Sequence, residues 1–336
     1  MADTIKIGNL DISSFKVGSG DCTVYLGTTL LYSGGTTPPT PPTHDYSLDY
    51  FTIRSLEDGN VITYEHSGYT SSNFSSTTIS YSTDSGQTWN SVTTTFSVNS
   101  YTLATLDTDE TILIKGTNQK YCPANARAHH FMFSKFGSVE GNILSLQYGD
   151  NFSSITSIDI SLAFKKILYS NTKLKSAENL IVPNVQLSSG CCSHMFSGCT
   201  SLETPPELLS TSLNGTCYGN MFNGCTSLTT APELPATTLS ASCYSSMFRN
   251  CTSLTTAPQL NATTLIGNCY NNMFNGCTSL NEITCLATDI SASICTTNWL
   301  NNVSSSGTFI KSANMSSWSS GGNGIPSNWT VQDYSS

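Results

Sequence analysis

Hydrophobic residues recur with a period of 26 from residue 187 to about residue 300. A Met-Phe pair occupies the same place in four successive units, and a CTSL segment begins three residues after each phenylalanine. Repeats of roughly 20–50 residues indicate stacked architectures, because each unit buries its apolar side only against its neighbours. The sequence therefore predicts a solenoid whose interior consists of columns of like residues. These columns are Phe196, Phe222, Phe248 and Phe274, then Cys199, Cys225, Cys251 and Cys277, then Leu202, Leu228, Leu254 and Leu280.

Each unit combines two local patterns. Leu239, Cys243 and Met247 are four residues apart, a spacing typical of a short helical turn with one apolar side. The Thr-rich stretch TTAP that follows favours an extended strand, because threonine is β-branched. Strands of stacked units pair in parallel at about 4.8 Å. We therefore expect a mainly β fold, with a leucine-rich-repeat solenoid of short helical turns and parallel strands.

Both ends of the array differ from the repeated unit. Residues around Ile167 and Leu174 predict a degenerate first coil that lacks the cysteines. The coil contains several lysines, including Lys165. Charged residues are expected on a capping repeat, because one of its faces is in contact with water. After Trp299 the pattern dissolves, and the aromatic residues that follow predict a closing cap.

The front half alternates apolar and polar residues, which is typical of strands. Segments such as YFTI, VITY, TISY and TILI are separated by turn residues and predict a sandwich of short strands. The chain is therefore expected to have five parts. They are a small β-module at residues 1–35 that anchors the protein, a Pro/Gly linker at 36–45, a β-sandwich-like domain at 46–147, the solenoid at 148–300 and a C-terminal cap at 301–336.

Composition changes this picture in two ways. Charged residues make up only 10% of the 336 residues, against roughly 25% in a typical soluble protein. A polar but nearly uncharged surface suits an extracellular or particle-surface β-protein. The net charge of −9 leaves no basic stripe for a phosphate backbone, so we expect no nucleic-acid partner. No apolar run approaches the ~20 residues that span a bilayer, and the start lacks the apolar region of a signal peptide. We therefore expect synthesis in the cytoplasm, no export by a standard signal and no membrane partner.

The repeated unit also resembles a known family. Phe222-Asn-Gly-Cys225-Thr-Ser-Leu228, followed by a strand and a proline, resembles the BspA-type leucine-rich repeats. The unit MFNGCTSLTTAPELPATTL is similar to arrays in surface proteins of gut Bacteroidetes and in phages that infect them, such as the crAss-like phages. The resemblance covers about residues 160–336. It implies a binding or structural scaffold and not a catalyst.

The chain has 13 cysteines, and two readings of them are open. The favoured reading is free, buried thiols, because small apolar side chains suit a narrow solenoid interior and cytoplasmic synthesis keeps thiols reduced. The alternative is a secreted disulfide scaffold. No CxxC spacing occurs, so the cysteines predict no metal site.

Other candidate chemistry is interpreted as structural. Residues 82–89 match the Asp-box S-x-D-x-G-x-T-W, in which Asp84 accepts N–H groups across a hairpin. Adjacent side chains on a strand point to opposite sides, so one of His129 and His130 is expected to face in and the other out. Glu207 and Glu233 occupy equivalent repeat positions and are interpreted as solvated surface sites. We therefore assign no catalytic, cofactor-binding or metal-binding residues.

One column is a candidate for ligand contact. Tyr218, Tyr244 and Tyr270 directly follow inward cysteines and are expected to point away from the core, where their rings can stack on sugars. The alternative is that the three rings pack on one another. The Thr/Ser/Asn-rich strand face is a second candidate contact surface.

These observations lead to a hypothesis about function. The leading one is a structural phage virion protein, a fibre-like appendage of head or tail that displays the repeats for attachment to a host-surface glycan or protein. Its expected partners are other virion proteins, bound through the N-terminal module, and further copies of itself, with a trimer as the working assumption. The alternatives are a BspA-like bacterial surface adhesin and a carbohydrate-active enzyme built on the β-domain.

Overall fold

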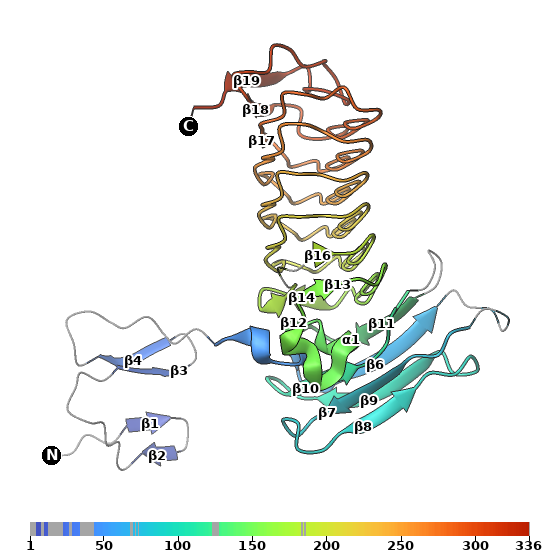
Figure 1. Cartoon of the computed structure of the whole chain (residues 1–336). Coiled ribbons are helices and arrows are strands. Elements are labelled where there is room, and N and C mark those ends of the chain that lie inside the picture. The colour runs from blue at the N-terminus through green and yellow to red at the C-terminus, as the bar shows by residue number, and fades with distance from the viewer. Residues whose placement is uncertain are drawn as a thin grey trace. The chain divides into compact units, whose positions relative to one another are not determined.

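The computed structural model shows a mainly β chain with two compact units, residues 1–45 and 46–336 (Figure 1). It describes the backbone of residues 5–7, 10–12, 23–26 and 29–33, and then residues 44–67, 70, 72, 74–122, 128–182, 184 and 186–335. Each unit is described by itself below.

The first unit contains two antiparallel pairs of short strands. Strand β1 (Ile5–Ile7) pairs with β2 (Leu10–Ile12), and β3 (Thr23–Leu26) pairs with β4 (Thr29–Ser33). Both pairs lie within residues 1–35, where the sequence predicts a small β-module. Most of the expected linker, residues 36–43, lies outside the described residues.

The second unit begins with the short 3-10 helix η1 (Tyr46–Leu48) and two sheets. The larger sheet has the order β14-β12-β5-β10-β7-β8, with β15 also paired to β12, and the smaller has the order β11-β6-β9. Their strands are β5 (Phe51–Ser55), β6 (Asn60–Ser67), β7 (Thr78–Ser82), β8 (Asn90–Thr93), β9 (Ser100–Leu106), β10 (Thr111–Gly116), β11 (Ala128–Phe133), β12 (Gly137–Asn142), β14 (Leu174–Ser176) and β15 (Leu180–Ile181).

The two sheets share one core. Burial alternates along β6, as expected of a strand with one face covered. Phe51 of the larger sheet packs on Phe131 of the smaller one, with ring centroids 5.5 Å apart, and both side chains are fully buried. Each such side chain contributes roughly 1.5–3 kcal/mol on burial before the cost of ordering it.

The solenoid is built directly onto these sheets. After the helices α1 (Ser145–Tyr148) and η2 (Gly149–Ser154), the chain enters the first coil, whose strands β14 and β15 pair in parallel with β12. The Phe131 N–H donates to the Ile167 carbonyl of the same coil. The end of this coil that was expected to face water is instead covered by the sheets. Lys165 is only 4% exposed there, whereas Lys175 keeps 44% of its side chain exposed.

Six successive coils contain a tight turn segment with an unusual backbone. In residues 216–224, each even-numbered N–H donates to a carbonyl 25 residues ahead, in the next coil, while odd-numbered N–H groups such as that of Cys217 donate three residues back. Every fourth residue has a positive φ, beginning at residues 162, 190, 216, 242, 268 and 294 of the six coils. The predicted helical turn is wrong. The segment is a ribbon hydrogen-bonded to its neighbours, although it shares the four-residue spacing of a helix.

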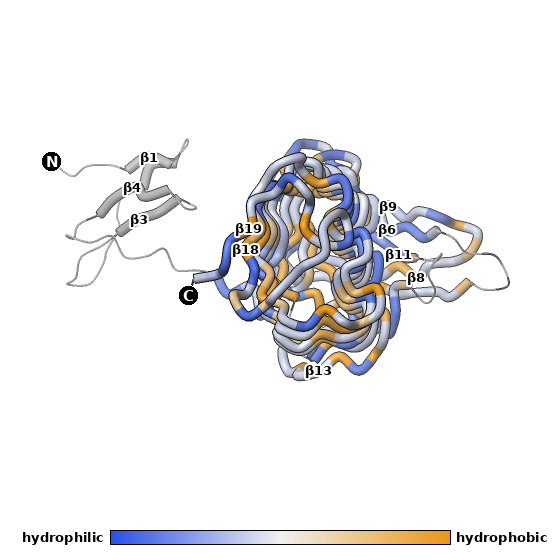
Figure 2. The backbone as a smooth tube through the Cα atoms, turned by 90° about the horizontal axis from the view of Figure 1, so that it is seen from above, coloured by the Kyte–Doolittle hydropathy of each residue, from blue (hydrophilic) through white to orange (hydrophobic). Residues whose placement is uncertain are grey.

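The other side of each coil is extended. Short strands β13 (Ser157–Ile158) and β16 (Gln186–Leu187) pair in parallel, and isolated parallel bridges such as Thr230 to Thr256 join later coils. At the C-terminal end, β17 (Glu282–Cys285), β18 (Gly307–Lys311) and β19 (Trp329–Asp333) form a parallel sheet. The result is a β-solenoid of about seven turns with the predicted 26-residue period. Seen along the stack, the coils superimpose (Figure 2).

Like residues stack on like throughout the interior, as the repeat predicts. The rings of Phe196, Phe222, Phe248 and Phe274 lie nearly parallel, with successive centroids 5.4, 5.6 and 5.6 Å apart. The predicted cysteine and leucine columns are fully buried beside them. Such offset stacking adds about 0.5–1.5 kcal/mol per pair to the free energy gained by burial.

Aromatic residues close the C-terminal end. Trp299 stacks on Trp318 with centroids 5.4 Å apart, and Phe309 packs edge-on against both rings. The indole N–H of Trp299 donates to the Gly324 carbonyl, so this buried polar group is satisfied. The segment therefore covers the last coil with side chains that the repeat itself does not contain.

The ribbon yields a prediction at Gly224, where φ is +80° and a Cβ would meet no atom closer than 3.8 Å. Gly224→Ala is therefore expected to destabilise through backbone strain alone, by about 1–2 kcal/mol. Gly267→Ala is the matched control, because Gly267 has no positive φ and its equivalents in neighbouring coils are Ala241 and Ser293. Urea unfolding followed by circular dichroism measures the free energy of unfolding of both variants. If the two variants were equally stable, the backbone strain at residue 224 would be contradicted.

Candidate functional site

The candidate tyrosine column lies inside the solenoid and not on its surface. Tyr218, Tyr244 and Tyr270 are each only 1% exposed. Their rings stack on one another at 6.1 and 6.3 Å, and Trp299 extends the stack by a further 6.1 Å. The expectation that they face a ligand is wrong, and the alternative of mutual packing is correct. The reason is the ribbon backbone, in which Cys217 and Tyr218 are consecutive and both point inward.

The tyrosine hydroxyls are also inaccessible to a ligand. Those of Tyr218 and Tyr244 are buried without a hydrogen-bond partner among the described residues. Burial raises the pKa of both phenols well above the ordinary value. A buried unsatisfied hydroxyl costs about 1–3 kcal/mol, which the stacking of the rings has to offset. The column is therefore a packing element.

The cysteines form a second buried ladder. All twelve cysteines among the described residues are free and buried, which confirms the free-thiol reading for them. The thiols of Cys225, Cys251 and Cys277 donate to carbonyls of the preceding coil, at sulfur–oxygen distances of 3.2, 3.1 and 2.9 Å. Burial raises the pKa of the Cys277 thiol to about 12. These groups are weak donors in a core and poor nucleophiles.

The two adjacent histidines are both buried, so the expectation that one faces out is wrong. Their side chains do point to opposite sides of β11, but both sides are covered. His129 stacks on Tyr64 at 5.9 Å and its ring contacts the Thr94 hydroxyl at 3.2 Å. Burial lowers the pKa of His129 to about 3, and burial also lowers that of His130, with Lys166 of the first coil adding to the shift. Both act as neutral core residues.

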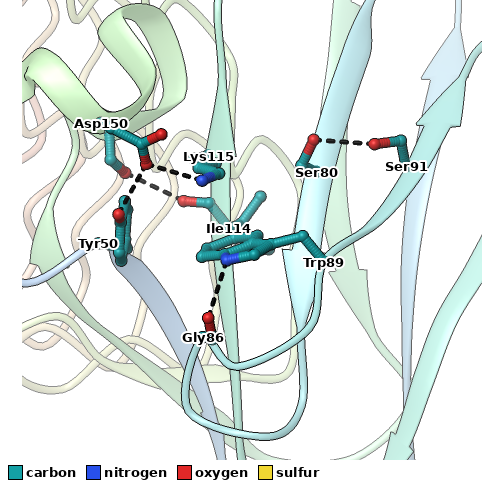
Figure 3. A network of polar contacts seen from close by, with 9 residues as sticks. Tyr50, Ser80, Gly86, Trp89, Ser91, Ile114, Lys115 and Asp150 are labelled. Carbon is teal, nitrogen blue, oxygen red and sulfur yellow. Dashed lines mark hydrogen bonds and ion pairs between the residues drawn. The ribbon is translucent and has the colours of Figure 1, made fainter.

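The Asp-box holds a hairpin, as predicted. Asp84 accepts hydrogen bonds from the Thr88 N–H at 2.9 Å and the Thr88 hydroxyl at 2.6 Å, and Gly86 has a φ of +85°. The Trp89 indole N–H donates to the Gly86 carbonyl at 3.1 Å (Figure 3). The hydrogen bonds from Ser82 and Thr88 lower the pKa of Asp84 to about 2.

A charged cluster beside this hairpin was missed by sequence reasoning. Lys115 donates to Asp150 at 2.7 Å and lies 3.9 Å from the Trp89 ring centroid, while the Tyr50 hydroxyl also donates to Asp150 at 2.7 Å (Figure 3). These four residues come from separate segments, and only Trp89 belongs to a motif. Lys115 and the Tyr50 hydroxyl both donate to Oδ1 of Asp150, and Lys115 lies over the Trp89 ring, so the cluster ties η2 to the hairpin.

Rows of threonines remain as the exposed repeated feature. Parallel bridges align Ser176 with Thr204, and Thr230 with Thr256. We define the threonine rows by exposed residues of the extended side, namely Thr204, Thr229, Thr230, Thr237, Thr238, Thr255, Thr256, Thr263 and Thr264. Acidic residues end the rows, since bridges join Thr256 to Glu282 and Thr264 to Asp289, and Glu207 and Glu233 are exposed as expected. Each hydroxyl offers one donor and two acceptor sites, beside a methyl group. The rows therefore form a hydroxyl-rich surface, repeated coil by coil, that can contact a ligand.

The buried thiols lead to a second prediction. In native protein at pH 8 the described cysteines are expected to react slowly with a disulfide reagent such as Ellman's reagent, because they are inaccessible and protonated. Because Cys22 lies outside the described residues, Cys22→Ser is the proper background. In guanidinium, all twelve remaining thiols are expected to react at once. Rapid labelling of several thiols in the folded variant, or fewer than twelve in denaturant, would contradict the ladder.

Histidine burial leads to a third prediction, on pH. The unfolded chain protonates His129 below its ordinary pKa of 6.5, whereas the folded protein does not until about pH 3. Stability therefore falls as the pH drops through this window, by at most about 1.4 kcal/mol per pH unit for this group. His129→Gln is expected to give a shallower decline of unfolding free energy between pH 6.5 and 4. His44 is exposed, so His44→Gln is the control. If the unfolding free energy of His129→Gln fell with pH as steeply as that of wild type, the lowered pKa of His129 would be refuted.

No family model, curated protein or solved structure matches the chain. The part of the chain that the structure describes contains no helix long and apolar enough to cross a bilayer. The described residues also bring together no group of three or more His, Cys, Asp or Glu side chains that could hold a metal ion. The function has therefore to be inferred from the molecule itself.

Proposed function

We propose that the protein is a structural display scaffold that attaches a larger particle to a cell surface without performing catalysis. The observation that carries this proposal is the pairing of an interior of stacked apolar columns with an exterior of threonine rows. Several of the described groups that could carry chemistry are occupied in packing or in pairing. The thiols and His129 are buried in the core, and Lys115 and Asp150 pair with each other.

Repetition suits attachment better than turnover. Catalysis needs one distinguished place with perturbed groups, whereas equivalent coils repeat the same surface. Several weak contacts of one kind raise the overall affinity through effective concentration when they engage together. The uncharged hydroxyl rows favour a hydroxyl-rich or amide-rich partner, such as a surface glycan or an extended protein segment.

The setting that we propose is a phage virion, with the protein as a fibre-like appendage of head or tail. This part rests on the resemblance of the repeated unit to BspA-type leucine-rich repeats. In this proposal, residues 1–35 anchor the chain to other virion proteins and the solenoid is displayed. The two sheets act as a sandwich-like domain, which we call the base. The paired strands of the first unit are too short to bury a core alone, which favours a partner surface or further copies of the chain.

Attachment is tested with labelled full-length protein and intact gut Bacteroidetes cells. Thr230→Glu combined with Thr256→Glu places two charges in the threonine rows and is expected to lower cell binding by about tenfold or more, since buried unpaired charge is costly at a contact. Ser291→Glu with Ser293→Glu, at exposed positions outside the rows, is the matched control. Absence of wild-type binding would refute attachment, and equal loss in both variants would refute the role of the rows.

The anchoring role is tested by deleting residues 1–35 from the chain in the phage that encodes it. The shortened protein is expected to fold but to be missing from purified particles, as judged by mass spectrometry. Its incorporation at wild-type levels would refute anchoring by this unit. Detection of the wild-type protein on bacterial surfaces, and not in particles, would instead support the adhesin alternative.

A further inference from the structure

A cavity opens where the two sheets of the base separate. It has a volume of about 640 Å³ and is lined from the larger sheet by Tyr81 of β7 and Asn90 of β8, and from the smaller sheet by residues 103–106 of β9. Small-molecule sites usually measure roughly 300–1,000 Å³, so this space is large enough for one.

The strand register shows why this space is not filled. Ile79 is fully buried between the sheets, and Tyr81, two residues further on, lies on the same side of β7. Tyr81 pairs directly with Asn90, so the Asn90 side chain shares that side too. The outward side of the same strands has Ser80 and Ser91, whose hydroxyls are 2.9 Å apart (Figure 3). Inward positions thus change from apolar to polar towards one end of β7 and β8.

The opposite wall is mixed and the rim is acidic. On β9, Leu103 and Leu106 are only 7% and 3% exposed, beside the half-buried Ala104 and the exposed Thr105. Asp109 and Glu110 line the cavity from the loop between β9 and β10, and none of the ten lining residues is basic. The space therefore offers a small apolar patch and an aromatic ring within a mainly polar lining that includes an amide and two carboxylates.

The acidic loop is held in place before any ligand arrives. The Asp109 N–H donates to the Ser55 carbonyl at 3.0 Å, and the Asp109 carbonyl accepts from Arg54 Nη1 at 3.1 Å. The Asp107 N–H donates to Glu110 Oε2 at 2.8 Å. A preorganised site loses less entropy when a ligand binds.

We propose that this cavity binds a short, neutral oligosaccharide. A pyranose ring has a C–H face that packs on aromatic and aliphatic side chains, and hydroxyls that donate to carboxylates and bond with amides. The acidic rim disfavours uronic or sialic acids, because their carboxylates meet like charge. The inference deepens the proposed attachment role, on which it rests for the source of the saccharide, and it places recognition in the base as well as on the threonine rows.

The test is saturation-transfer NMR on the full chain. The probes are the methyl glycosides of glucose, galactose, mannose and N-acetylglucosamine, with cellobiose and lactose, and glucuronate and spermidine serve as the anionic and cationic comparators. At least one neutral saccharide is expected to bind, and glucuronate to bind about tenfold more weakly or not at all. Preference for glucuronate or spermidine, or no binding of any neutral probe, would overturn the inference.

Variants locate the binding. Tyr81→Ala and Asn90→Lys are each expected to weaken saccharide binding about tenfold. Because Asn90 is exposed, Asn90→Lys leaves the core intact and covers the case in which Tyr81→Ala unfolds. Tyr334→Ala, at an exposed tyrosine near the C-terminal end, is the matched control. Undiminished binding in Asn90→Lys would overturn the site, whereas cell attachment and particle incorporation, measured separately, decide the attachment role.

Discussion

The hydrogen bond from one coil to the next is the interaction on which the rest of this structure depends. In the first five of the six turn segments, alternate N–H groups donate to the following coil and the others donate three residues back, so the backbone is satisfied without a helix or a long strand. This arrangement holds neighbouring coils in one register. Because the sequence repeats at the same period, the register places Phe on Phe, Tyr on Tyr and Cys on Cys, and packing and hydrogen bonding support the same stack.

A stack of this kind has two open ends, and each is closed differently. At the first coil the sheets of the base continue into the solenoid, with β12 pairing to β14 and β15, so the hydrophobic interior passes from one to the other without a boundary. At the last coil the aromatic residues around Trp299 cover the columns. Exposed column ends would leave apolar surface in water, so both closures are needed for a stable array.

The stack also determines where distinct chemistry can lie. Equivalent coils present equivalent surfaces, and the solenoid is therefore suited to repeated, weak contacts. Departures from symmetry occur in the base, where Lys115, Asp150 and Trp89 meet and where the sheets separate beside Tyr81. A single, specific site is accordingly expected in the base, and multivalent contact along the threonine rows.

The sequence by itself determined the period, the buried columns, the free thiols and the Asp-box hairpin, because each follows from residue type at a fixed spacing. Tertiary structure decided the rest. A four-residue spacing is common to a helix and to this ribbon, and only the adjacent coil decides which carbonyl an N–H reaches. For that reason the prediction of a helical turn was wrong. The prediction that the tyrosines point outward was also wrong, because consecutive residues such as Cys217 and Tyr218 both point inward in the ribbon. The covered first coil, the buried His130 and the cavity beside Tyr81 likewise depend on contacts between distant segments, which no local pattern records.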